Sequence, residues 1–182
     1  MRGWFVRLRL PAPTRRVRSL SCAAIVTAVS APLPAQDLKA VDRVPTVTLE
    51  AAMVAAQAAL ADCRRRGATV AVAVVDRSGN PVAMVRDPLA GMHTPDTAVR
   101  KAWTAVSFKS STTELIAATA AGGASAGIRH LPHVAVIGGG QLIQAAGSTV
   151  GGIGVSGAPS GEMDDACAAA GIRAIRDALE LG

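Results

Sequence analysis

The sequence predicts an α+β fold in which one five-stranded antiparallel sheet is covered by helices. Hydrophobic periodicity along the 182 residues gives the order helix, two strands, two helices, three strands, helix. The predicted strands are joined by glycine-containing turns that are too short to hold a crossover helix, and such turns connect antiparallel neighbours. Half of the residues are apolar and 18% are charged, a composition that argues against disorder.

The first helix and the first hairpin have clear end signals. Thr48 is a capping residue, and Gly67 follows three arginines that suit the carboxyl end of a helix dipole. Segments 69–76 and 81–86 flank a Ser-Gly-Asn turn, which predicts a β-hairpin. One apolar stripe of the helix is expected to face the core: Leu49, Met53, Ala56 and Leu60.

The second half of the domain is predicted to hold two helices, three strands and a terminal helix. Thr94 followed by Pro95 starts a helix that runs to about Phe108, and a shorter helix starts at Thr112 or Thr113 and stops at a glycine pair. The expected strands are 134–137, 141–146 and 149–155, and the last helix is 162–181. Because the helices are rich in alanine, the core has little bulk, which favours homo-oligomers with shared buried surfaces.

The positive charge of the chain lies almost entirely at its amino-terminal end. The net charge is +6, yet residues 46–182 contain as many anions as cations. A nucleic-acid site needs clustered Lys and Arg, with aromatic side chains for single strands, and Trp103 and Phe108 are the only aromatics after residue 45. We therefore expect no nucleic-acid partner.

The amino-terminal segment is typical of an export signal. An arginine-rich start precedes a weakly apolar run at 19–31, and small residues at Ala31 and Ala35 suit cleavage. We expect a signal peptide at 1–35, a linker at 36–46, a domain at 47–182 and a periplasmic or secreted protein. Arg15-Arg16 leaves Sec and twin-arginine export both open. No transmembrane segment is expected in the mature chain.

Removal of this leader would leave two cysteines, Cys63 and Cys167. They permit one disulfide, but the sequence does not show whether their helices touch, and two buried thiols are the favoured interpretation. No spacing of Cys and His matches a structural zinc site.

A glycine-rich run and the histidines are the remaining candidates for chemistry. Residues 152–157 match GxGxxG, but the chain lacks the parallel strand that a dinucleotide fold needs afterwards, so these glycines are expected to allow close backbone packing or ligand approach. His130 and His133 are interpreted as surface residues. His93 stands at a helix start near Arg86, Arg100 and Lys101, where a neutral imidazole can ligate iron and cations attract carboxylates.

Several segments, in order, resemble one family. They are residues 70–86, 90–94, 100–105, 137–140 and 152–157, with Asp164 and Cys167 in the last helix. Together they resemble the GlcG/HbpS family of haem-binding proteins, which is related to the C-terminal domain of PduO-type proteins. The resemblance implies a profilin/PAS-like fold, homo-oligomers, export, haem near subunit surfaces and, in some members, a membrane sensor as partner.

The resulting hypothesis is an exported haem-binding protein with a haem-sensing or redox-stress role. Because aromatic residues are scarce, we expect weak binding. The alternative is an accessory protein or enzyme for a small, glycolate-like carboxylic acid, without haem; a non-enzymatic role is favoured and no catalytic residue is assigned. The expected haem-site residues are His93, as axial iron ligand, with Arg86, Met92, Thr94 and Lys101.

Overall fold

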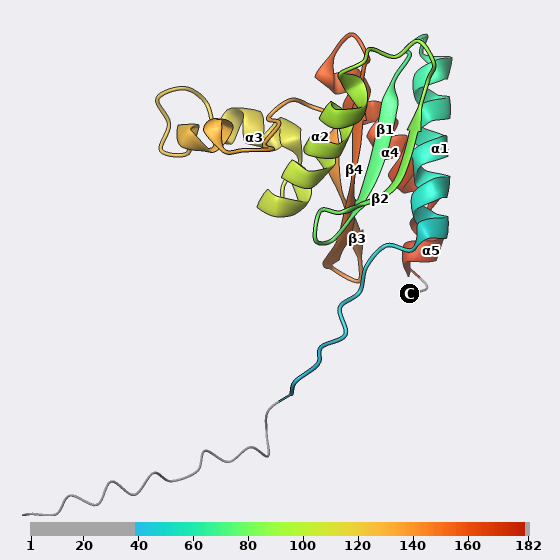
Figure 1. Ribbon diagram of the computed structural model, residues 1–182, viewed down its shortest axis with the longest axis vertical. Coiled ribbons are helices and arrows are strands. Elements are labelled where there is room, and N and C mark those ends of the chain that lie inside the picture. The colour runs from blue at the N-terminus through green and yellow to red at the C-terminus, as the bar shows by residue number, and fades with distance from the viewer. Residues whose placement is uncertain (1–38, 181–182) are drawn as a thin grey trace, which may run out of the picture. The chain divides into compact units, whose positions relative to one another are not determined.

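Ten helices and strands lie within residues 39–180, the part of the chain that this computed structural model describes (Figure 1). From Arg43 onward the described residues form one compact unit. In chain order the elements are α1 (Leu49–Arg65), β1 (Ala71–Asp76), β2 (Pro81–Arg86), α2 (Thr94–Phe108), α3 (Thr112–Ala118), the 3-10 helix η2 (Ala126–His130), β3 (Gly140–Ala145), β4 (Ser148–Ser156), α4 (Gly161–Ala174) and α5 (Arg176–Glu180).

Helix α1 begins and ends where its capping residues predict, but only half of its expected apolar stripe is buried. The Thr48 hydroxyl accepts a hydrogen bond from the Ala51 amide, and Gly67 has a φ of 79° beyond the last turn. Leu49 and Met53, expected in the core, are 54% and 36% exposed. Ala56 and Leu60, the other two residues of the expected stripe, are buried as predicted, together with Ala52, Ala55, Ala59 and Cys63. Apart from Leu60 these buried side chains are small, which allows close packing of the helix.

The sheet is antiparallel, as predicted, but it has four strands rather than five. Their order is β2-β1-β4-β3, so β1 and β4 lie at the centre. The segment 134–137 was expected to be the fifth strand. It runs instead beside α2, where the Ala135 amide donates to the Thr104 hydroxyl at 2.9 Å and the Val134 amide to the Leu131 carbonyl at 3.3 Å. These amides are bound outside the sheet, so no ladder forms there.

The helices of the second half also depart from prediction. Helix α3 has a full capping box between Ser111 and Glu114, but it ends at Ala118, before the glycine pair. The expected terminal helix 162–181 is divided, because Ile175 separates α4 from α5. Residue 181 lies outside the described residues.

Helices cover both faces of the sheet (Figure 1). Helices α1 and α4 pack on one face, where Val72, Val74, Ile153 and Val155 contribute to a continuous apolar core. Alternate residues of the same strands point to α2 on the other face, where the apolar clusters are small and contain mostly alanine. Helix α3 extends away from the sheet beyond α2.

A disulfide joins the two helices of the first face. Cys63 of α1 and Cys167 of α4 are bonded, with their Cα atoms 5.5 Å apart and their positions separated by 104 in sequence. The interpretation as two buried thiols is therefore wrong. The sequence left open whether the two helices touch, and the packing of α1 against α4 brings these cysteines together.

On the second face, glycines allow α2 to lie almost directly on β4. A Cβ atom added at Gly154 would lie 2.0 Å from the Ala98 carbonyl oxygen, and one at Gly152 would lie 2.9 Å from the Ala102 carbonyl oxygen. The expectation that the glycine run serves close backbone packing is thus confirmed at these two positions.

The expected signal peptide at 1–35 lies outside the described residues, as does the start of the expected linker. Among the described residues, no helix combines the length and the apolar character that a membrane span requires.

Candidate functional site

A pocket of about 420 Å³ opens between the amino-terminal end of α2 and the turn that leads from β4 into α4. Three of the five predicted site residues, His93, Thr94 and Lys101, line this pocket. Its opposite wall is the turn 156–161, and Ile137 borders it from the segment beside α2. The start of one helix and the end of a central strand therefore meet at one cavity.

The first turn of α2 leaves the imidazole of His93 exposed at the pocket. His93 occupies the N-cap position, but its side chain makes no capping hydrogen bond. The local backbone is held by its neighbours: the Thr94 hydroxyl donates to the Gly91 carbonyl at 2.7 Å, and the Thr97 hydroxyl to the His93 carbonyl at 2.9 Å. A Cβ at Gly91 would come within 2.9 Å of the His93 ring, so glycine at this position makes room for the imidazole.

A buried ion pair forms the floor of the pocket. The Lys101 ammonium donates to the Asp164 carboxylate at 2.8 Å and to the Val155 carbonyl at 2.9 Å, and the two side chains are 2% and 5% exposed. Burial raises the pKa of Asp164, while the hydrogen bond and charge of Lys101 act in the opposite direction. The Ala158 amide also donates to this carboxylate, which ties the turn after β4 to the pair.

The triple glycine 138–140 fits around this pair. A Cβ at Gly139, whose φ is 114°, would lie 2.6 Å from the Val155 carbonyl and 3.1 Å from the Lys101 ammonium. The Gly139 amide donates to the Asp165 carboxylate at 2.8 Å, and the Gly140 amide to the Thr112 hydroxyl at 2.9 Å. This segment therefore closes over the ion pair only because it has no side chains.

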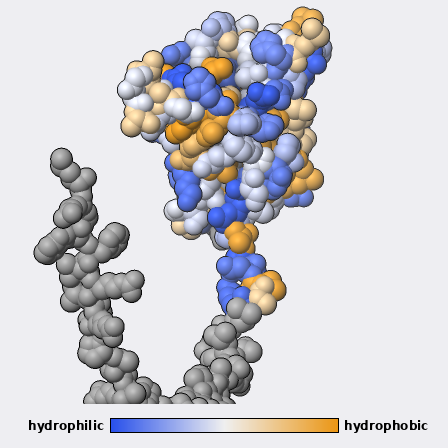
Figure 2. Space-filling model, turned by 60° about the vertical axis from the view of Figure 1, so that its left-hand side comes forward, coloured by the Kyte–Doolittle hydropathy of each residue, from blue (hydrophilic) through white to orange (hydrophobic). Residues whose placement is uncertain are grey.

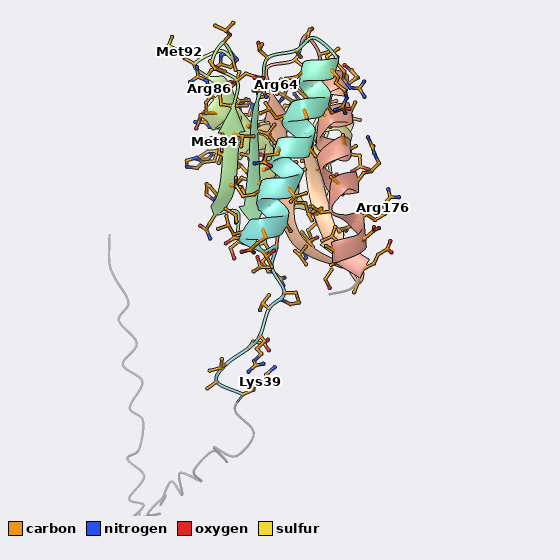
Figure 3. The ribbon with its side chains drawn as sticks, turned by 90° about the vertical axis from the view of Figure 1, so that its right-hand side faces the viewer. Lys39, Arg64, Met84, Arg86, Met92 and Arg176 are labelled. Atoms are coloured by element: carbon orange, nitrogen blue, oxygen red, sulfur yellow. A yellow bond between two sulfur atoms is a disulfide. The ribbon has the colours of Figure 1, made fainter. Side chains whose placement is uncertain are left out.

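The other two predicted residues do not line the pocket. Arg86, at the end of β2, donates to the carbonyls of Pro88 and Ala90 at 3.2 and 3.0 Å, so its guanidinium holds the loop that leads to α2. Met92 is 94% exposed. Figure 3 shows Arg86 and Met84 beside β2, and Met92 on the loop beyond the end of that strand.

Sequence reasoning also missed residues that shape the site. Asp164 was noticed only as part of a resemblance, and its partnership with Lys101 joins positions 63 residues apart, which no local pattern reveals. Ile137 was expected in a strand, yet it is 54% exposed at the pocket. The only local signal was the apolar run 134–137, which follows His130 and His133, and it predicted a strand rather than a lining of the pocket.

Known proteins resemble the chain over most of this unit. Residues 47–173 match the family described as "Haem degrading protein HbpS-like". A double mutant of HbpS from Streptomyces reticuli is 40% identical, with 79% of this chain and 96% of that chain covered and a TM-score of 0.71. A PduOC–haem complex is 30% identical, covering 71% of this chain and 95% of that one, with a TM-score of 0.67.

A longer relative matches as well. The corrinoid adenosyltransferase PduO of Citrobacter freundii is 37% identical over 108 residues, which are 58% of this chain and 32% of that protein. The chain thus spans about a third of the length of that relative.

Proposed function

Because the chain belongs to the HbpS-like family of haem-degrading proteins, we propose that it binds haem at the pocket beside α2, with His93 as an axial ligand of the iron. The observation that carries this proposal is the exposed, uncapped imidazole of His93 at the edge of a cavity. A solved relative of 30% identity is a PduOC–haem complex, which supports the choice of ligand.

The residues present suit this prosthetic group. A neutral imidazole is a common haem ligand, and haem supplies a redox-active iron whose behaviour depends on that ligand and on the polarity around it. Ile137 offers exposed apolar surface next to the imidazole, and Thr97 and Ser156 offer hydroxyl groups. The mixture of apolar and polar lining, without an aromatic side chain, supports weak rather than tight binding.

The two cations that the competing small-acid hypothesis requires are both bonded to other groups of the protein. Lys101 was to bind a carboxylate, but its ammonium is already paired with Asp164. Arg86 was to be the second cation, but it is bound to two loop carbonyls away from the pocket. No observation in the described residues favours this alternative.

We further propose that the protein acts after export, in the periplasm or outside the cell, as a homo-oligomer. In this role it would report haem or redox stress, with a membrane sensor as a partner. The support for export is the composition of residues 1–35, and the support for assembly is the alanine-rich core.

The test is a hemin titration followed by the Soret band. The wild type is expected to give a saturable shift, and His93→Ala to lose it, because the substitution removes the ligand nitrogen. His130→Ala, at an exposed histidine of η2, is the matched control and is expected to bind like the wild type. A wild type without a saturable shift would refute haem binding, and an unchanged His93→Ala would refute the ligand assignment. Loss of the Soret band with a reductant and dioxygen together, but not with the reductant alone, would indicate oxidative degradation of the macrocycle in addition to binding.

A further inference from the structure

A second hollow adjoins the His93 pocket along α2. It has a volume of about 300 Å³ and shares Thr97 and Ile137 with the first pocket as lining residues. Its far end carries two arginines, Arg100 of α2 and Arg129 of η2. We call the two hollows together the α2 groove.

The periodicity of the helix aligns the groove. His93, Thr97 and Arg100 are spaced by four and three residues, so they lie on one side of α2. Seven residues of α-helix rise about 10.5 Å, so the imidazole and the Arg100 backbone stand at the two ends of a groove two turns long. This length is comparable with the span of a porphyrin from its iron to its propionate groups.

The two ends of the groove differ in charge. The Nε atom of Arg100 lies 2.8 Å from an Asp96 carboxylate oxygen in an ion pair, and Arg129 donates to the carbonyls of Thr119 and Ile116 at 2.7 and 2.8 Å. Each guanidinium carries five N–H donors, so these bonds leave donors for an additional anion. With Asp96 included, the hollow at this end carries a formal charge of +1.

Apolar surface separates the imidazole from the arginines. Ile137 is 54% exposed at the point shared by both hollows, and Val134 and Val136 line the second one. Figure 2, in which the side of the molecule with α2 and α3 comes forward, shows apolar surface enclosed by polar groups. An imidazole, an apolar floor and a cationic end match a flat apolar molecule with a central metal and carboxylates at one edge.

We propose that Arg100 and Arg129 bind the propionate groups of haem, while Ile137 contacts the macrocycle. This inference rests on the proposed haem function and names different residues from those the sequence indicated, Arg86 and Lys101. It also assigns Asp96 a role: its carboxylate orients Arg100 but repels the propionates.

The experiment compares hemin with hemin dimethyl ester, whose propionates carry no charge. The wild type is expected to bind hemin more tightly than the ester. Arg100→Gln and Arg129→Gln are each expected to weaken hemin binding by about fivefold and to reduce the preference over the ester, since exposed ion pairs are worth up to about this factor. Asp96→Asn is expected to strengthen hemin binding. Arg173→Gln, an exposed arginine of α4, makes the same charge change outside the groove and is the control.

The outcomes separate this inference from the haem proposal. If the wild type shows a His93-dependent Soret shift but binds hemin and the ester equally, the propionate assignment is overturned while haem binding stands. If the wild type shows no saturable shift with either compound, the haem proposal itself fails. Arg129 also donates hydrogen bonds to carbonyls in and just after α3, so Arg129→Gln could weaken hemin binding by destabilising the fold. If the melting temperature of this variant is lowered, the comparison of hemin with its ester on the wild type decides the propionate assignment.

Discussion

The two faces of the sheet are packed against their helices in different ways. On the face covered by α1 and α4, valines, isoleucines and alanines form a continuous core, and a disulfide joins the two helices. On the face covered by α2, glycines and alanines bring the helix close to β4, and a buried ion pair links α2 to α4. The first face stabilises the fold, and the second combines a thin core with the cavity.

This difference matters for binding because a ligand site needs polar groups that are fixed in place. Lys101 links α2, β4 and α4 through two hydrogen bonds at the floor of the pocket. The face covered by α1 and α4 is held in addition by apolar packing and a disulfide, although Asp164 of α4 takes part in the same ion pair. We therefore expect the two faces to respond differently to substitution, and three predictions test this expectation.

The largest effect is expected from the disulfide. Replacing Cys63 and Cys167 together by serine removes a crosslink between positions 104 residues apart. A crosslink over such a long loop restricts the unfolded chain, so its loss should lower the free energy of unfolding by about 4 kcal/mol. Denaturant unfolding of the variant and of the wild type, the latter with and without a reductant, measures this. Hemin affinity is expected to stay unchanged, and a large loss of affinity would show that the two faces are coupled.

A somewhat smaller effect is expected from the ion pair. Lys101→Met leaves the Asp164 carboxylate buried without its partner, which should cost about 3 kcal/mol of stability at neutral pH. Burial already raises the pKa of Asp164 above its value in the unfolded chain, and removing the ammonium raises it further. The folded state then holds the proton more strongly, so stability is lost as the pH rises through the folded pKa.

The stability deficit of Lys101→Met should therefore shrink as the pH falls through the raised folded-state pKa of Asp164, and it should be smallest below the ordinary pKa of an aspartate. Unfolding curves over a pH series test this sign. The double variant Lys101→Met/Asp164→Leu, which removes both charges, is expected to recover much of the loss. A deficit that is independent of pH would mean that Lys101 acts through packing alone.

The smallest of the three effects is expected at the contact of α2 with β4. Gly154→Ala places a Cβ 2.0 Å from the Ala98 carbonyl oxygen and 2.8 Å from the Ala102 amide nitrogen. Both of these are backbone atoms of α2, so no side chain can rotate away to make room. The helix must move away, at a cost of about 2 kcal/mol. Gly127→Ala is the control, because a Cβ there meets nothing within 4 Å. If both variants unfold at the same denaturant concentration as the wild type, the close contact between α2 and β4 does not require glycine at position 154.

Local sequence signals predicted the first half of the fold better than the second. The cap at Thr48, the turn at Gly79 and the start of α2 at Thr94 involve neighbouring residues only, and each was read correctly. The strand expected at 134–137 does not form, because the Ala135 amide donates to Thr104 of α2 and the Val134 amide to the Leu131 carbonyl, and the sequence does not place α2 beside this segment. The apolar stripe of α1 was half right: Ala56 and Leu60 are buried, whereas Leu49 and Met53 are exposed and the rest of the buried face is mostly alanine.

The candidate site shows the same limit. His93 could be singled out because a histidine at a helix start, near cations, is a local pattern. Whether those cations can bind a ligand depends on the folded structure. Lys101 is paired with Asp164, 63 positions away, and Arg86 donates to carbonyls of the folded loop that follows β2.

By itself, the sequence determined the α+β class, the antiparallel pairing, the helix starts and the glycines that allow close packing, because turns and caps act over a few residues. Only the tertiary structure decided the number of strands, the Cys63–Cys167 bond and the residues that surround His93. These features depend on contacts between segments that are distant in sequence, and such contacts form only when the helices pack on the sheet.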